Sequence, residues 1–166
     1  MPDERGETIV MTATLGGPRD SRIVLGWREW VGLPDLGIPA LKVKVDTGAR
    51  TSSLHAARVE RIGNGRVRFC VYPHQNDDDD VIEAEADLVD ERFVRNSGGH
   101  AERRPVIRTV LLIEGIHFGA ELTLSNRALL GFRMLLGREA LRGRFLVDPG
   151  QSYRCGRGRD LHKEEA

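Results

Sequence analysis

One stretch of this sequence constrains the fold most, Val43-Lys44-Val45-Asp46-Thr47-Gly48-Ala49. Its first residues alternate apolar and charged side chains, as a half-buried strand does, and the strand delivers a carboxylate to its end. Thr47 can hydrogen-bond locally, and Gly48 lets the backbone turn sharply beside Asp46. Because Asp and Gly are common in ordinary turns after strands, this triplet alone does not identify a site.

A second segment strengthens the case that the first is a site. Arg133-Met134-Leu135-Leu136-Gly137-Arg138 is an apolar strand that ends in Leu-Leu-Gly-Arg. The residues that follow favour helix, so the sequence predicts one short helix of one or two turns over Arg138 to Arg142.

The chain between and around these segments has mostly a period of two, which is typical of strands. Apolar residues alternate with polar ones from Val67 to Val71 and from Ile116 to Leu124, and Val106 to Ile113 is a continuous aliphatic run. Phe145-Leu146-Val147 is a short last strand, ended by Asp148-Pro149-Gly150. Many short strands separated by Gly and Asp turns predict an all-β domain, closed or sandwiched.

The ends of the chain are polar and rich in Gly, Pro or Arg. We therefore expect three regions: a flexible amino-terminal arm at residues 1–21, one domain at 22–153, and a flexible carboxyl-terminal tail at 154–166.

Composition excludes several classes of protein. Twenty-five basic residues balance twenty-five acidic ones among 166, so there is no overall attraction to nucleic acid or to anionic membranes. No apolar run approaches the ~20 residues of a membrane-spanning helix, and the first residues do not resemble a secretory signal. We expect a cytoplasmic protein, unless a leader has been removed. Cys70 and Cys155 are far apart in sequence, and two free thiols are favoured over a disulfide.

The acidic run Asp77-Asp78-Asp79-Asp80 lies between two predicted strands. It could bind a divalent cation, but EF-hand spacing is absent. The favoured interpretation is a solvated hairpin tip.

The Asp-Thr-Gly stretch and the later Leu-Leu-Gly-Arg strand together resemble the retropepsins, the aspartic peptidases of retroviral type. Further stretches, among them Trp27-Arg28-Glu29-Trp30-Val31 and Phe145 to Gly150, are similar to a bacterial retropepsin-like family. That family is catalogued as putative ATP-dependent zinc proteases and is associated with a glutamate ligase that modifies a ribosomal protein. The resemblance covers about residues 23 to 153 and implies a closed β-barrel, one half of an acid protease, with one short C-terminal helix.

The residues themselves do not support zinc or ATP. None of the five histidines pairs with another at helical spacing, and there is no Gly-rich loop ending in Gly-Lys-Ser or Gly-Lys-Thr. We expect neither a metal nor a cofactor.

Aspartic peptidase chemistry needs two carboxyl groups that share a proton. The chain has a single Asp-Thr-Gly, so the resemblance implies a C2 homodimer that brings Asp46 together with its symmetry mate. In that pattern Thr47 bonds across the axis. The alternative is a monomer in which Asp46 only caps a turn.

Retropepsins also close a hairpin flap over the substrate, and residues 92–106 are the best candidate. An ordinary exposed hairpin is an equally good interpretation. The resemblance assigns catalysis to Asp46, Thr47 and Gly48, and the candidate substrate-binding residues are Ala49, Arg50, Ser97, Gly98, Gly99 and Arg138.

Arg50 departs from the retropepsin pattern, which has there an acid that pairs with the later Arg. Arg138 must therefore find another partner or face the substrate. One hypothesis is an electropositive cleft suited to glutamate-rich peptides, formed by Arg50, Arg103, Arg104 and Arg138. Salt-screened surface arginines are the alternative.

The sequence thus predicts a homodimeric aspartic endopeptidase whose partners are a second copy of itself and a peptide or protein substrate. The alternative is a non-catalytic module of the same fold that binds a peptide or a partner, and a metal-dependent hydrolase ranks last. Substitution of Asp46 by Asn separates the first two.

Overall fold

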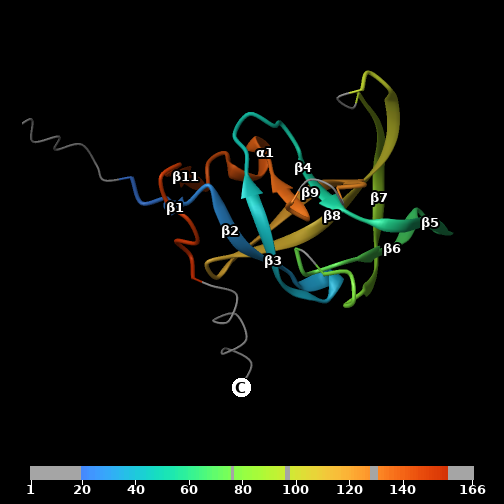
Figure 1. Ribbon diagram of the computed structural model, residues 1–166, viewed down its shortest axis with the longest axis horizontal. Helices are drawn as coiled ribbons and strands as arrows, with labels where there is room; N and C mark the ends of the chain where they lie inside the picture. The colour runs from blue at the N-terminus through green and yellow to red at the C-terminus, as the bar shows by residue number, and fades with distance from the viewer. Residues whose placement is uncertain (1–19, 76, 96–97, 128–130, 157–166) are drawn as a thin grey trace, which may run out of the picture.

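The computed structural model describes residues 20–75, 77–95, 98–127 and 131–156 (Figure 1). Most of residues 1–21, Ser97 and the end of the tail lie outside these ranges. The elements are β1 (Ile23–Leu25), β2 (Arg28–Leu33), the 3₁₀ turn η1 (Pro34–Leu36), β3 (Ile38–Val45), β4 (Ser52–His55), β5 (Ala57–Gly63), β6 (Arg66–Val71), β7 (Ile82–Arg95), β8 (Ala101–Ile113), β9 (Ile116–Ser125), β10 (Met134–Leu136), α1 (Arg138–Leu141) and β11 (Phe145–Val147).

Six of these strands form a closed barrel. Neighbouring strands pair in the order β2-β3-β10-β4-β9-β8, and β2 pairs again with β8 where Gly32 lies opposite Leu112. The prediction of an all-β, closed barrel with one short helix is confirmed, and α1 begins at Arg138 as expected. β7, β6 and β5 continue the sheet beyond the barrel, and β1 pairs with β11 in a separate two-stranded sheet.

The period-two pattern has the expected physical result. Leu41 and Val43 face the barrel interior and are buried, whereas Lys42 and Lys44 lie on its outer side. Leu54, Leu122 and Leu136 bury their side chains in the same core. Each such side chain contributes about 1.5–3 kcal/mol relative to an exposed one, so the core fixes the strand ends on which the polar residues lie.

β7 and β8 form the long hairpin expected at residues 92–106. They pair from Asp87 opposite Arg108 to Arg95 opposite Ala101, and the tip extends past the barrel (Figure 1). Gly98 and Gly99 are exposed at this tip, and Gly99 has a positive φ of 79°. The hairpin geometry is therefore present, although its movement as a flap remains a prediction.

A buried carboxylate attaches the segment that follows β11. Glu29 is fully buried, and it accepts hydrogen bonds from the N–H groups of Gly26 (2.7 Å), Arg154 (2.8 Å) and Cys155 (3.3 Å). A buried charge requires such partners. The attached chain therefore extends to Cys155. Both cysteines are free thiols, as predicted, and burial together with Glu29 raises the pKa of Cys155 to about 12.

The acidic run lies in the connection between β6 and β7, and all four of its side chains are exposed. Two of them pair with other side chains: Arg133 donates from Nη2 to Asp78 at 2.5 Å, and His74 Nε2 lies 3.2 Å from Asp80 Oδ2. Arg133 is itself buried and precedes β10, so this exposed loop is tied to the strand beside Asp46.

Candidate active site

The strand β10 holds the backbone of the Asp46 loop. β10 runs parallel to β3, with Leu136 opposite Val45, and the N–H of Asp46 donates to the carbonyl of Leu136 at 2.9 Å. The late apolar strand therefore packs beside the Asp-Thr-Gly turn, as the resemblance implied. Asp46 comes directly after the last residue of β3.

The turn between β10 and α1 fixes the far side of the same loop. The N–H of Arg138 donates to the carbonyl of Ala49 at 2.7 Å, and the N–H of Gly137 donates to Ser52 Oγ at 2.9 Å. A Cβ at position 137 would lie 2.5 Å from the backbone carbon and oxygen of Thr51. Only glycine allows this close approach, so Gly137 is needed for the geometry of the loop.

The loop orients the Asp46 side chain and leaves one oxygen open. Oδ1 accepts hydrogen bonds from the N–H groups of Gly48 at 2.9 Å and Ala49 at 3.2 Å. Within the described residues, Oδ2 has no hydrogen-bond partner. Thr47 and Gly48 are exposed beside it. The carboxyl group is thus held by its own backbone and presented at the surface of this chain.

Strand register places Lys44, two positions before Asp46, in one row with residues of the neighbouring strands. Across the sheet, Lys44 pairs with Leu135, Leu135 with Ser53, and Ser53 with Thr123. In this row of four residues Lys44 is exposed, whereas Ser53 and Thr123 are buried.

Arg127 is the site residue that sequence reasoning missed. Its guanidinium donates to Ser53 Oγ at 3.1 Å and to the carbonyl of Phe132 at 3.3 Å. Burial and the charge of Arg104 lower the pKa of Arg127, while the charge of Asp46 opposes that shift. The charges of Asp46 and Arg104 therefore both act on Arg127. Nothing in the sequence around Arg127 marks it; only the strand register brings it here.

His55 accepts a hydrogen bond from the backbone of Arg127. The N–H of Arg127 donates to Nδ1 of His55 at 2.8 Å. Burial, with the nearby charge of Arg133, lowers the pKa of His55, and its ring stacks on Tyr72 at 5.8 Å. Because Nδ1 accepts a hydrogen bond, the proton of the neutral ring is on Nε2.

The four arginines of the hypothetical cleft have different partners in the structure. Arg50 pairs with Glu139 at 2.9 Å, and Arg138 donates from Nη1 to the carbonyl of Thr47 at 2.9 Å. Arg103 pairs with Glu91 and covers the exposed ring of Phe93. Arg104 pairs with Glu102 at 3.3 Å, and its charge also acts on Arg127. The partner of Arg138 is therefore a backbone carbonyl of the Asp46 loop and not an acid.

A family model matches residues 24–157 of this chain, which is most of its length. The model is that of the RimB-like family, described as the retropepsin-like aspartic endopeptidase RimB. The chain belongs to the RimB-like family.

Relatives of this RimB-like chain carry a different name. Over 149 residues it is 42% identical to a probable alpha-L-glutamate ligase of Shewanella pealeana, covering 88% of this chain and 32% of that protein. Over 147 residues it is 46% identical to another of the same name from Parasynechococcus marenigrum, covering 87% and 31%. The chain therefore spans about a third of the length of these curated relatives.

A solved structure shares the fold. The crystal structure of a protein of unknown function from Legionella pneumophila, Lpg0085, superposes with a TM-score of 0.69 at 25% identity, covering 81% of this chain and 99% of that one. This likeness supports the barrel architecture and assigns no activity.

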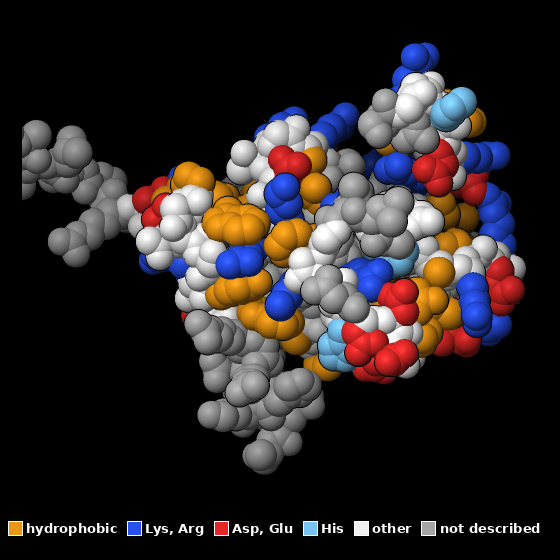
Figure 2. Space-filling view, viewed as in Figure 1, with side chains coloured by type: hydrophobic (Ala, Val, Ile, Leu, Met, Phe, Trp, Pro, Cys, Tyr) orange, Lys and Arg blue, Asp and Glu red, His pale blue; other side chains and the backbone are white. Residues whose placement is uncertain are grey.

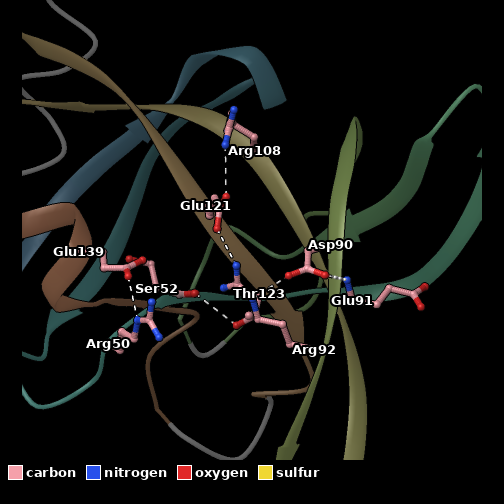
Figure 3. A network of polar contacts seen from close by, with 9 residues as sticks. All are labelled: Arg50, Ser52, Asp90, Glu91, Arg92, Arg108, Glu121, Thr123 and Glu139. Carbon is pink, nitrogen blue, oxygen red and sulfur yellow. Dashed lines mark hydrogen bonds and ion pairs between the residues drawn. The ribbon is translucent and has the colours of Figure 1, made fainter.

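The base of the RimB-like hairpin is braced by ion pairs (Figure 3). Glu121 on β9 accepts from Arg92 at 2.8 Å and from Arg108 at 3.2 Å, and Arg92 also bonds Asp90 at 3.0 Å. The hydrogen bonds from Arg92 and Arg108 lower the pKa of Glu121. The hairpin is therefore tied to the barrel below its tip.

A cavity of about 180 Å³ lies near this brace. Its lining residues are Ser52, Gly119, Ala120, Glu121, Glu139, Ala140 and Arg144. Asp46 does not line it, so this cavity is not the site of the carboxyl group. In the described part of the chain, no three His, Cys, Asp or Glu side chains are grouped as metal ligands would be, and no helix is long and apolar enough to cross a membrane.

Proposed function

We propose that this chain is one half of a homodimeric aspartic endopeptidase and that Asp46 is its catalytic acid. The observation that carries the proposal is the Asp46 carboxyl group, which is fixed through Oδ1 by its own loop and open at Oδ2. An ordinary turn aspartate needs neither the parallel support of β10 nor the close approach at Gly137.

The chemistry requires a second carboxyl group beside the first. Two carboxyl groups about 3 Å apart cannot both ionise cheaply, so the pair holds one proton and titrates as a unit. The ionised member takes a proton from a water molecule, and the water oxygen attacks the peptide carbonyl carbon. The protonated member gives its proton to the carbonyl oxygen. Collapse of the resulting diol breaks the C–N bond, with a proton passing to the leaving amine.

Two features support dimerisation. Thr47 and Gly48 are exposed in the single chain, although they flank a group that needs a partner. In addition, β1 and β11 form a parallel sheet of only two strands among the described residues. A two-stranded sheet is marginal alone, and pairing with strands of a second copy would complete it.

We propose that the substrate is an acidic, glutamate-rich peptide or tail. Lys44 precedes Asp46 by two positions, and the charges of Asp46 and of the cation Arg104 both act on Arg127, where the two cations repel each other. A carboxylate side chain of a substrate would relieve that repulsion. The relatives named as glutamate ligases contain a part similar to this chain, which agrees with a glutamate-containing substrate. The β7–β8 hairpin, which carries Arg104, is the proposed flap.

The variant Asp46→Asn tests the catalytic assignment. We expect cleavage of an acidic peptide to fall by about 10³-fold or more, because both general acid–base groups of the dimer are lost together. Asp35→Asn is the matched control, since Asp35 is an exposed aspartate on η1. Circular dichroism and sedimentation should show both variants folded and dimeric. Unchanged cleavage by Asp46→Asn refutes the assignment, and a chelator-sensitive activity would point to a metal instead.

The substrate class has a separate test. Arg127→Gln should raise KM for an oligoglutamate peptide far more than for a neutral peptide, because a half-buried cation beside the acid is lost. Arg103→Gln removes the same charge from the other side of the hairpin and should leave both peptides unaffected. Equal cleavage of neutral and acidic peptides by the natural chain would exclude the acidic substrate while leaving the peptidase intact. A binding module without catalysis would retain peptide affinity in every variant that keeps Arg127.

A further inference from the structure

A stack of alternating aromatic rings and cations covers the outer side of β2 and β3. Figure 2 shows hydrophobic and Lys or Arg side chains alternating on this face. From the Asp46 side outward, the stack consists of Phe132, Trp27, Arg28, Tyr153, Trp30 and Lys42. All six are half-buried, so each presents part of its surface to solvent.

The contacts in the stack are close enough to be specific. The guanidinium carbon of Arg28 lies 4.6 Å from the ring centroid of Trp27 and 4.9 Å from that of Tyr153. Lys42 Nζ lies 5.3 Å from the centroid of Trp30. Cations within about 6 Å of a ring are attracted by its quadrupole. The rings therefore position both cations but do not neutralise them.

Neither cation has a carboxylate partner in the part of the chain that the structure describes. Arg28 donates from Nε to the hydroxyl of Ser152 at 3.2 Å, a neutral group. By contrast, Arg92, Arg103 and Arg104 on the hairpin each pair with an acid. The stack is thus a positively charged aromatic surface in a chain of zero net charge.

Tyr153 holds its place in the stack with a strained backbone conformation. Tyr153 has a φ of 52°, in the left-handed region that bulky residues avoid, and its N–H donates to the carbonyl of Arg28 at 2.9 Å. Glycine would adopt this conformation at no cost. Such strain clusters at functional sites, and here it holds a ring against the Arg28 guanidinium.

The stack is continuous with the candidate active site. The carbonyl of Trp27 accepts from the N–H of Val45, the residue before Asp46, at 2.8 Å. Arg28 lies opposite Lys44 in the strand register. On β3, Lys44 and Lys42 precede Asp46 by two and four positions, so Lys42 lies about 13 Å from Asp46 along the extended chain.

We propose that this stack binds the acidic part of the substrate polypeptide that extends beyond the cleft. The inference rests on the proposed function and adds a second contact region to it. Arg28 and Lys42 would bind substrate carboxylates, and the rings would pack against the methylene groups and backbone of the bound chain. An extended peptide must continue about four residues past Asp46 to reach Lys42. Substrate affinity therefore grows with the length of the acidic segment.

The tryptophans provide a direct readout. The chain has two, Trp27 and Trp30, and both lie in the stack. Oligoglutamates of about four and about twelve residues, chosen from the rise of an extended chain, should be titrated onto the uncleaving Asp46→Asn variant. The longer peptide should change tryptophan emission, and less so at high salt. No emission change, or the same change with both peptides, overturns the proposal. A change on diluting the protein without peptide would assign this face to a second copy instead.

A charge-reversal pair completes the test in the active chain. Lys42→Glu should raise KM for the long oligoglutamate by about three- to tenfold, as expected for loss and reversal of an exposed ion pair. It should leave kcat for the long peptide unchanged, and it should not change KM or kcat for the short peptide. Arg58→Glu makes the same reversal at an exposed position on the far edge strand β5 and should change neither. Equal effects of the two variants refute the stack as a binding site. If the long oligoglutamate changes tryptophan emission but the natural chain does not cleave it, the peptidase assignment fails and the stack stands as a binding site.

Discussion

The Asp46 loop and the β7–β8 hairpin both bring charged groups to the same space, but different forces hold them. Backbone hydrogen bonds to β10 and α1 fix the loop, and a Cβ at position 137 would lie 2.5 Å from the backbone of Thr51. The hairpin extends beyond the barrel and is braced by ion pairs such as Arg92 with Glu121, whose side chains are about a third exposed.

Because of this difference, the Asp46 loop is held in place more firmly than the hairpin. Buried backbone hydrogen bonds are costly to break, so the loop keeps the Asp46 carboxyl group in one orientation. Exposed ion pairs contribute little and are screened by salt. The hairpin can therefore open at small cost while the acid below it stays fixed. Substitutions in the loop should accordingly have large effects, and those in the hairpin small ones.

The largest effect is expected for Gly137→Ala. Its Cβ would meet the backbone of Thr51, and we expect a loss of about 3 kcal/mol in the free energy of unfolding, together with loss of cleavage. Gly119→Ala is the control, because a Cβ there meets nothing within 4 Å; its free energy of unfolding should stay within about 1 kcal/mol. Urea denaturation measures both. Similar stability of the two variants would show that the loop is not tightly clamped.

The next effect concerns a buried hydroxyl. Ser52→Ala removes the Oγ that accepts from the N–H of Gly137, which leaves a buried donor unpaired and should cost about 1–3 kcal/mol. Thr109→Val also removes a buried hydroxyl, but this one has no partner among the described residues. Its removal should be neutral or stabilising. The contrast fails if both variants lose the same free energy of unfolding.

A smaller effect is expected at the base of the hairpin, and it depends on pH. Arg92 and Arg108 lower the pKa of Glu121 below its ordinary value of 4.5. Their contribution is therefore complete above pH 4.5 and is lost as pH falls through the lower, folded-state pKa. Glu121→Gln should reduce stability by less than about 1 kcal/mol at pH 7 and by nothing at strongly acidic pH. Hydrogen exchange of the hairpin amides should accelerate at pH 7. A difference that persists at low pH would contradict this origin.

The smallest effect distinguishes two neighbours on the hairpin. Arg104 pairs with Glu102 and its charge acts on Arg127, whereas Arg103 pairs with Glu91. Arg104→Gln should raise KM for an oligoglutamate by about two- to fivefold, the range of one exposed ion pair, and Arg103→Gln should not change it. Steady-state kinetics on one peptide measures both. A larger effect of Arg103→Gln would place the cleft on the opposite face of the hairpin.

The sequence predicted the architecture because local patterns determined it. Alternating apolar residues predicted β3 and β9. Gly137 predicted the turn after Leu136, and a short segment that favours helix predicted α1. The position of Asp46 beside the late strand came from a resemblance, and the observed pairing of Leu136 with Val45 agrees with it.

What the sequence did not predict depends on register and on partner choice. Arg127 reaches Ser53 across 74 positions, and no local pattern encodes that contact. The sequence left the partners of Arg50 and Arg138 open; in the structure Arg50 pairs with Glu139, and Arg138 donates to the Thr47 carbonyl. The alternating stack on β2 was invisible because Phe132 and Tyr153 come from distant segments. Charge clusters in sequence are therefore poor guides to charge clusters in space.

The central claim is that two Asp46 carboxyl groups meet. A crystal structure of the assembled protein measures this most directly. We predict a two-fold axis through the Asp46 loops with the carboxyl oxygens of the two chains about 3 Å apart, close enough to share a proton. A stable monomer, or a dimer in which the two carboxyl groups lie far from the axis, would contradict the claim.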